Sequence, residues 1–279
     1  MLSSLFGLLS ALTWGAGDFA GGIASRRAGA YRAAFYGEAS GLIFLAIMML
    51  IVRERMPPWS DLGLSAVAGV MGSLGLLLLF RSLADGMMSI AAPVSALMAA
   101  VLPVITSSLT QGLPGPARYA GFALALTAIW LISRGDDHQK KLHLHLADLR
   151  RPLFSGILFG IYFILMNWGS QTATVWPMVS ARFSGAFILF WFALAKHAVN
   201  WPEKRIVPLV FLNAAGDIGG NTFYILAGQV GRLDVAAVLG SLYPGMTVLL
   251  AGLLLHERLN RSQWTGILAA LGAIVLMTV

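Results

Sequence analysis

The chain has 279 residues, of which 58% are hydrophobic and only 11% are charged. A soluble domain carries about 25% charged residues, so this composition excludes an ordinary soluble protein and indicates an integral membrane protein. The net charge of +7 comes without a basic patch interleaved with aromatic residues, which excludes a nucleic-acid partner, and the absence of cysteine excludes disulfides and thiolate chemistry.

Apolar segments of about 20 residues recur from one end of the chain to the other, and each is long enough to cross a bilayer as a helix. The first segment lacks a positively charged leader, so we expect it to be a span and not a cleaved signal peptide. The predicted fold is an all-α integral membrane protein with ten transmembrane helices. The predicted spans cover residues 3–22, 31–52, 62–84, 88–111, 117–133, 152–171, 176–197, 205–228, 234–254 and 262–279.

The two halves of the chain resemble each other. A shift of 145 residues superposes three glycines of the first half on three of the second: Gly75 on Gly220, Gly86 on Gly231, and Gly121 on Gly266. An odd number of spans in each half forces the halves into opposite orientations, which is an inverted-topology repeat. The predicted organisation is a five-helix repeat over 1–133, a polar connecting loop over 134–151 and a second five-helix repeat over 152–279.

Lys and Arg residues are distributed unequally between the two sides of the membrane. Most fall in the loops after the odd-numbered spans, and the other side holds only Arg53, Arg55, Arg118 and Arg232. Because cytoplasmic loops are enriched in Lys and Arg, we expect the odd-numbered loops to face the cytoplasm and both termini to lie outside. The expected location is the cell membrane, as a multi-pass protein of a bacterial inner membrane.

The first span and its counterpart in the second half both carry polar and aromatic residues. Trp14 and Asp18 are four residues apart in the first, and Tyr162, Asn167 and Trp168 occur in the sixth. Polar groups inside a membrane are costly when they face lipid, so these residues are expected to face a cavity and bind substrate. The alternative for the tryptophans is an interfacial belt or plain core packing.

The eighth span places Asn213, Asp217 and Asn221 on one helix face, with Tyr224 slightly further round. We interpret this face as a substrate-binding cavity wall, and the alternative is a polar network that only packs helices together. Gly219 and Gly220 permit close approach of a neighbouring helix or ligand, and we predict that they take part in gating.

The ninth span and its counterpart, the fourth, contain residues that loosen a helix. Ser241, Tyr243 and Pro244 occur in the ninth; Pro93, Met98 and Pro103 occur in the fourth. The prolines are predicted hinges for a helix that bends during transport, or else mark static kinks. Ser241, Tyr243 and Met98 are predicted substrate contacts.

We expect structural roles for the charged residues elsewhere in the spans. Glu38 and Arg182 occupy equivalent positions in the two halves, where they either pair with each other or find local partners, and a structural role is expected. Arg81 and Asp85 are expected to form an ion pair at a helix end. The predicted cavity lies between spans 1, 3, 4, 6, 8 and 9, with spans 5 and 10 outside it.

Two short motifs resemble those of a known family. "LLLHERLN" (253–260) is similar to a signature of the EamA-type branch of the drug/metabolite transporter superfamily, with Glu257 at the signature acid and His256 in place of the usual glycine. "ALTWGAGDF" (11–19) resembles the Trp-Gly of its first span. The resemblance implies a transporter of a small metabolite in the export direction, similar to exporters of aromatic and other amino acids.

The expected function is therefore export of amino acids by alternating access, with a small molecule and the lipid bilayer as partners and no cofactor or metal. Asp18 or Asp217 would accept the substrate ammonium, amides and hydroxyls would bind its carboxylate, and aromatic residues with Met98 would contact its side chain. Alternatives are export of other metabolites or drugs, a channel, or an intramembrane enzyme. His138, His143 and His145 offer only a weak metal site in the polar loop. The oligomeric state is left open, and a monomer is compatible with the sequence.

Overall fold

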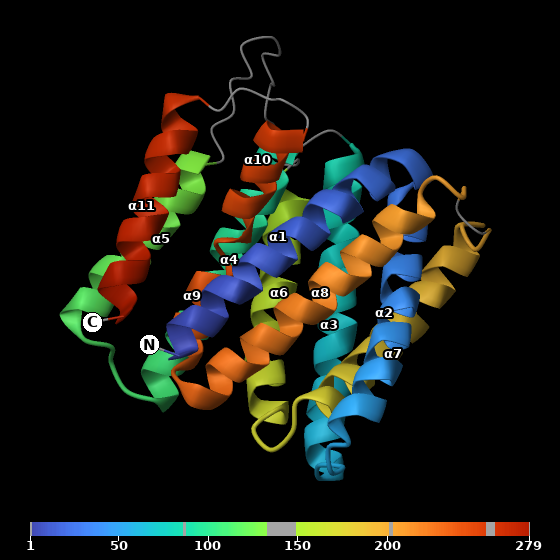
Figure 1. Cartoon of the computed structure of the whole chain (residues 1–279), viewed down its shortest axis with the longest axis horizontal. Coiled ribbons are helices and arrows are strands. Elements are labelled where there is room, and N and C mark those ends of the chain that lie inside the picture. Colours follow the sequence, from blue (N-terminus) through green and yellow to red (C-terminus); the bar gives the residue numbers. More distant parts are fainter. Residues whose placement is uncertain (1, 86–87, 133–148, 201–202, 255–259, 279) are drawn as a thin grey trace.

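The computed structural model describes residues 2–85, 88–132, 149–200, 203–254 and 260–278 (Figure 1). Within these ranges the chain is helical and contains no strand. Of the predicted polar loop over 134–151, the structure describes only residues 149–151. The three histidines of the loop, and His256 and Glu257, lie outside the described residues. The helices are α1 (Leu2–Ala28), α2 (Ala30–Val52), α3 (Trp59–Ala84), α4 (Met88–Thr110), α5 (Pro116–Ile132), α6 (Arg150–Gly169), α7 (Val175–Ala195), α8 (Val207–Val230), α9 (Leu233–Gly240), α10 (Tyr243–Leu254) and α11 (Arg261–Thr278).

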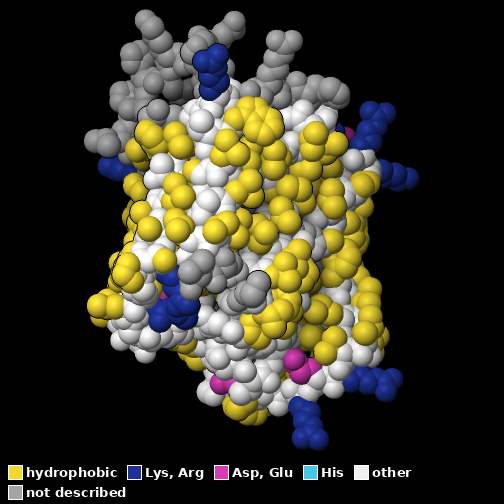
Figure 2. All heavy atoms as spheres, turned by 60° about the vertical axis from the view of Figure 1, so that its left-hand side comes forward, with side chains coloured by type: hydrophobic (Ala, Val, Ile, Leu, Met, Phe, Trp, Pro, Cys, Tyr) yellow, Lys and Arg dark blue, Asp and Glu magenta, His cyan; other side chains and the backbone are white. Residues whose placement is uncertain are grey.

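The surface of the bundle suits a lipid environment. By length and composition, α2, α3, α6, α7 and the segment that contains α9 and α10 can each cross a membrane, and shorter apolar stretches occur in α4, α5 and α11. The face formed by α5 and α11 exposes many hydrophobic side chains, while charged side chains lie toward its two ends (Figure 2). This distribution matches a bilayer core between two polar interfaces.

The most extensive helix contacts are α1 with α8, α3 with α6, α5 with α11, α4 with α6, and α3 with α7, and α2 also packs on α7. The first pair is tight because glycines on both helices let the backbones meet. A Cβ atom added to Gly216 would lie 2.6 Å from the Cα of Gly17, which leaves no room for a side chain. Small residues at a contact allow this close approach in membrane helices. The tight pair fixes the position of the polar face of α8.

The span predicted as one helix over 234–254 is two helices, α9 and α10, separated at Ser241–Leu242. The described residues therefore contain eleven helices, although α9 and α10 together still form a 22-residue apolar segment. Pro244 explains the interruption, because a proline has no N–H to donate to the carbonyl of Gly240 and tolerates only the first turn of a helix. The interruption places Tyr243 at the start of α10, inside the bundle.

Glu54, in the connection between α2 and α3, caps the beginning of α7. Its carboxylate accepts hydrogen bonds from the backbone N–H groups of Thr174 and Val175 at 2.7 and 2.8 Å, and its carbonyl accepts one from the Trp176 indole at 3.1 Å. A carboxylate at a helix N-terminus satisfies free N–H groups and interacts favourably with the helix dipole. The contact ties the end of α2 to the start of α7.

The predicted ion pair between Arg81 and Asp85 is wrong. Asp85 instead forms an exposed ion pair with Arg151, at the start of α6, and the Arg81 guanidinium lies 5.5 Å from the centre of the Tyr31 ring. Sequence spacing alone favoured the local partner, whereas packing of α3 against α6 brings a second arginine to the same carboxylate.

Candidate functional site

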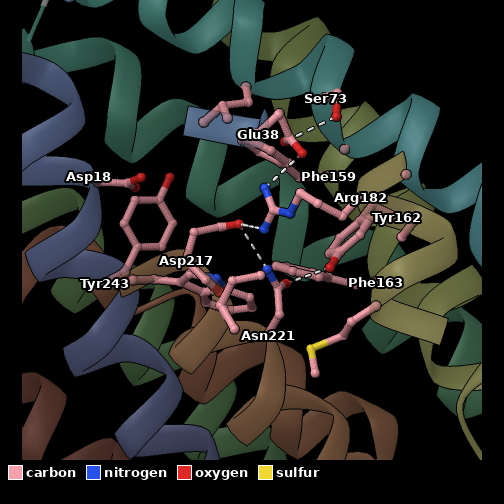
Figure 3. Close-up of a pocket in the computed structure, with 17 residues that line it drawn as sticks. Asp18, Glu38, Ser73, Phe159, Tyr162, Phe163, Arg182, Asp217, Asn221 and Tyr243 are labelled. Atoms are coloured by element: carbon pink, nitrogen blue, oxygen red, sulfur yellow. Dashed lines mark hydrogen bonds and ion pairs between the residues drawn. The ribbon is translucent and has the colours of Figure 1, made fainter. Parts of the chain in front are cut away.

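A cavity lies in the middle of the bundle (Figure 3). It encloses about 720 Å³ that protein atoms do not fill, part of it open to the outside. The cavity is lined by Trp14, Asp18, Glu38, Gly69, Gly72, Ser73, Leu76, Phe159, Tyr162, Phe163, Met178, Ala181, Arg182, Asp217, Ile218, Asn221 and Tyr243.

One wall of the cavity is aromatic. The ring centroids of Trp14 and Phe163 are 5.4 Å apart, and those of Tyr162 and Phe163 are 5.7 Å apart. Tyr224 stands behind this wall, 4.8 Å from Phe163, and its hydroxyl donates to the Phe163 carbonyl at 2.8 Å. Clustered rings in mutual contact form a stiff apolar surface, which suits the side chain or ring of a ligand.

A continuous chain of polar contacts also runs along the cavity lining and ends beside the aromatic wall (Figure 3). The Ser73 hydroxyl donates to Glu38 at 3.1 Å, and Glu38 pairs with Arg182 at 2.7 Å. Arg182 also pairs with Asp217, whose carboxylate accepts a hydrogen bond from the Asn221 amide at 3.1 Å. The Tyr162 hydroxyl donates to the Asn221 side-chain oxygen and ends the chain. These contacts connect α3, α2, α7, α8 and α6 around the cavity.

Asp18 lies in the cavity apart from this chain, beside Tyr243 and on the other side of Asp217 (Figure 3). Within the part of the chain that the structure describes, no hydrogen bond or ion pair reaches its carboxylate. The cavity therefore holds three carboxyl groups and one guanidinium. Arg182 is shared by two of the carboxylates, whereas Asp18 has no described hydrogen-bond or ion-pair partner.

Half of the predicted substrate-binding residues line the cavity. Their contact with substrate stays a prediction. They are Trp14, Asp18, Tyr162, Asp217, Asn221 and Tyr243. The others lie elsewhere in the structure and are absent from the described lining: Met98, Asn167, Trp168, Asn213, Tyr224 and Ser241.

Asn213 packs between helices instead of facing the cavity. Its amide donates to the carbonyl of Gly17 at 3.0 Å, and its side-chain atoms occupy the space beside Gly21 and Gly37. Asn167 is buried against Gly228 of α8, and the side chain of Trp168 is 45% exposed on the outer surface. For Asn213, the geometry matches the alternative reading of a helix-packing amide.

Met98 of α4 packs against Gly156 of α6, and Tyr224 supports the aromatic wall from behind. Ser241 is fully buried at the break between α9 and α10, and its hydroxyl has no hydrogen-bond partner among the described residues. These three residues shape the surroundings of the cavity without lining it.

The predicted hinge residues lie in three helices. Pro93 and Pro103 lie within α4, which continues through both; Pro244 lies in the first turn of α10, directly after the interruption. Gly219 and Gly220 lie within α8, where Gly220 contacts the Trp14 ring and Gly219 has ordinary space around it. Movement at these positions stays a prediction.

The set of helices predicted to surround the cavity needs correction. Among the described lining residues none comes from α4, whereas α2 contributes Glu38 and α7 contributes Met178, Ala181 and Arg182. Glu38 and Arg182 do pair with each other, as one reading of their equivalent positions predicted, but they also face the cavity. The signal was available, because a charge in the interior of an apolar span is costly unless it pairs or meets water.

Long apolar helices around a central cavity that contains charged side chains are typical of a multi-pass membrane protein. The model of the EamA-like transporter family matches residues 1–134 and 153–279, so the chain belongs to the EamA-like transporter family and is a membrane transporter of small molecules. The resemblance drawn from the sequence is thereby confirmed. A comparison with curated proteins gives no significant match.

Solved structures show the same architecture. The chain superposes on a protein of known crystal structure with a TM-score of 0.78, at 15% sequence identity, over 99% of this chain and 96% of the other. At this identity the likeness establishes the fold alone.

Proposed function

We propose that the protein exports amino acids, aromatic and medium-sized apolar ones among them, by alternating access. One observation carries the proposal: the cavity presents a cation, carboxylates and a cluster of aromatic rings together. An amino acid needs an acceptor for its ammonium, a donor for its carboxylate and an apolar surface for its side chain. Asp18 and Asp217 supply the first, Arg182 the second, and Trp14 with Phe163 the third.

Phosphorylated metabolites fit this cavity poorly. Arg182 is already paired with Glu38 and Asp217, so its positive charge is offset twice within the site. A phosphate dianion entering there would meet more negative than positive charge, and like charges disfavour one another at short range. A net-neutral zwitterion avoids this repulsion.

A hydrophobic cation is the second candidate substrate, and Asp18 is the observation that favours it. The carboxylate lies in the cavity without a described partner, close to an aromatic surface that suits a flat amine. The protein would then export cationic drugs or metabolites. Amines without a carboxylate therefore belong in every substrate screen.

Alternating access is supported by how the helices pair. If α1–α5 correspond to α6, α7, α8, α9–α10 and α11, exchanging the halves converts the α1–α8 contact into the α6–α3 contact. The α2–α7 and α5–α11 contacts convert into themselves. Such exchange is expected of an inverted repeat, in which the two halves can swap conformations to open opposite sides.

We further propose a bacterial inner-membrane location with both termini outside. The C-terminal ends of α1, α3, α5, α7 and α10 lie at one end of the bundle, and the start of α1 and the end of α11 lie toward the other (Figure 1). Arg26 and Arg27, at the end of α1, and Arg150 and Arg151, at the start of α6, belong to the first end, which the positive-inside rule assigns to the cytoplasm. A C-terminal reporter active only in the cytoplasm would contradict this orientation.

The substrate proposal is tested with purified protein in liposomes. We expect saturable flux of labelled phenylalanine, tryptophan, methionine or threonine that is stimulated by the same amino acid on the opposite side. Cells that overproduce the protein should also resist toxic amino-acid analogues. Absence of flux and of resistance for all amino acids, with flux of an aromatic amine in the same liposomes, would replace the proposal by the second candidate.

A further inference from the structure

The ion pair between Arg182 and Asp217 joins two helices that hardly touch otherwise. Among the described helices, α7 packs on α2 and α3, and α8 packs on α1 and α2, but α7 and α8 make almost no backbone contact with each other. Across this gap the Arg182 guanidinium pairs with Asp217, and the Thr222 hydroxyl lies 3.6 Å from the sulfur of Met178. The side chains of the cavity therefore form the connection themselves.

The two carboxylates bound to Arg182 differ in exposure. The side chains of Arg182 and Glu38 are each only 7% exposed, whereas that of Asp217 is 27% exposed. Glu38 is further held by the Ser73 hydroxyl at 3.1 Å. Breaking a buried pair is much more costly than breaking a partly hydrated one, so Glu38 stays with Arg182 and Asp217 is the partner that can be exchanged.

We propose that an amino-acid substrate inserts its charged head between Arg182 and Asp217, with its carboxylate on the guanidinium and its ammonium on the Asp217 carboxylate. This inference rests on the proposed function and assigns the subsite within it. Insertion replaces one ion pair by two and leaves neither Arg182 nor Asp217 without a partner. Arginine suits the carboxylate because its planar fork can bind both oxygens.

The same geometry gives an order of preference among related ligands. An amine without a carboxylate binds Asp217 and Asp18 but leaves Arg182 without Asp217 as a partner. A carboxylate without an ammonium takes Arg182 and leaves Asp217 unpaired, with Asp18 also in the cavity (Figure 3). Two unpaired carboxylates in one site are the least favourable outcome, so the order is zwitterion, then amine, then acid.

The test uses three ligands that share one aromatic side chain: phenylalanine, phenethylamine and 3-phenylpropionate. In wild-type proteoliposomes we expect phenylalanine to have at least a tenfold higher kcat/KM than phenethylamine, and 3-phenylpropionate to be the poorest, because loss of one partner of a buried charge pair costs at least a factor of about ten. Equal transport of phenylalanine and phenethylamine would overturn the inference and leave amino-acid export intact. Failure to transport any amino acid would end the proposed function, and the inference with it.

Two variants separate the roles of the pair. Asp217→Asn keeps the shape and removes the ammonium acceptor, so it should reduce the preference for phenylalanine over 3-phenylpropionate to less than about threefold. The double variant Arg182→Gln with Glu38→Gln removes the group that binds the carboxylate without leaving Glu38 as an unpaired buried charge. It should reduce the preference for phenylalanine over phenethylamine to less than about threefold. Asp85→Asn breaks the exposed pair with Arg151 and is the matched control, expected to keep wild-type ratios. Wild-type ratios in a folded Asp217→Asn protein would refute the insertion.

Separation of α7 and α8 gives a readout that needs no transport. The chain has no cysteine, so the double variant Met178→Cys with Thr222→Cys contains only two thiols, placed where these two side chains now meet. Insertion of a substrate head pushes the helices apart, so phenylalanine should slow oxidative cross-linking severalfold, and 3-phenylpropionate should not. Equal cross-linking with and without saturating phenylalanine would contradict the proposal.

Discussion

Substitution of Gly216 by alanine tests the contact that positions the polar face of α8. A Cβ atom there would lie 2.6 Å from Gly17 Cα, 2.7 Å from Gly17 N and 2.8 Å from the Thr13 carbonyl oxygen, all of them backbone atoms of α1. Ordinary contact begins at 3.4 Å, so the two helices would have to separate by several tenths of an ångström along their interface. Overpacking of this kind costs about 1–3 kcal/mol.

Gly219→Ala is the matched control, three residues along the same helix. Its Cβ atom would meet only the Thr13 side chain, at 3.5 Å or more. Both variants gain the same helix propensity, about 0.5–1 kcal/mol, so the difference between them isolates the packing cost of about 1–3 kcal/mol. Thermal unfolding in detergent should place Gly216→Ala several degrees below Gly219→Ala. Equal midpoints would show that the backbones of α1 and α8 are not in contact at this point.

Three further predictions concern individual side chains. Asn213→Ala should lose about 0.5–1.5 kcal/mol of stability because it removes the buried hydrogen bond from the amide to the Gly17 carbonyl. Asn221→Ala should keep its unfolding temperature and lose transport, and the reverse pattern would exchange their roles. Trp14→Ala should raise the KM for phenylalanine about tenfold by removing part of the aromatic wall, and the exposed Trp168→Ala should leave it unchanged, as concentration-dependent flux will show. Glu54→Gln should cost about 0.5–2 kcal/mol and accelerate hydrogen exchange over residues 174–178, and unchanged exchange there would contradict the cap.

Much of the architecture was predictable because it depends on local properties of the sequence. Length and hydropathy marked the apolar helices, and the predicted span 31–52 differs from α2 by one residue. Pro244 signalled a loosened helix, although not the complete interruption that separates α9 from α10. Helix length, hydropathy and the effect of a proline each depend on residues within a turn or two of the helix.

The candidate site was only partly predictable because it depends on how each helix is rotated in the bundle. Residues four apart in a helix are rotated by about 40°, so Asn213 and Asn221 differ by about 80° in direction. That difference decides that Asn221 faces the cavity while Asn213 lies between α1 and α2. Glu38 and Arg182 belong to different spans, and only the assembled bundle shows that both face the same cavity.

The cap that Glu54 forms on α7 has a mechanical consequence. The chain that leaves α2 holds the start of α7, and half-way along the same two helices Glu38 holds Arg182. Two attachment points oppose independent sliding or pivoting of α2 and α7, so we expect the two helices to move as one rigid unit. Any displacement of Arg182 is then transmitted to residues 53–58 at the end of the bundle. A fluorescent probe on that loop would serve as a remote reporter of what occupies the cavity, without touching it.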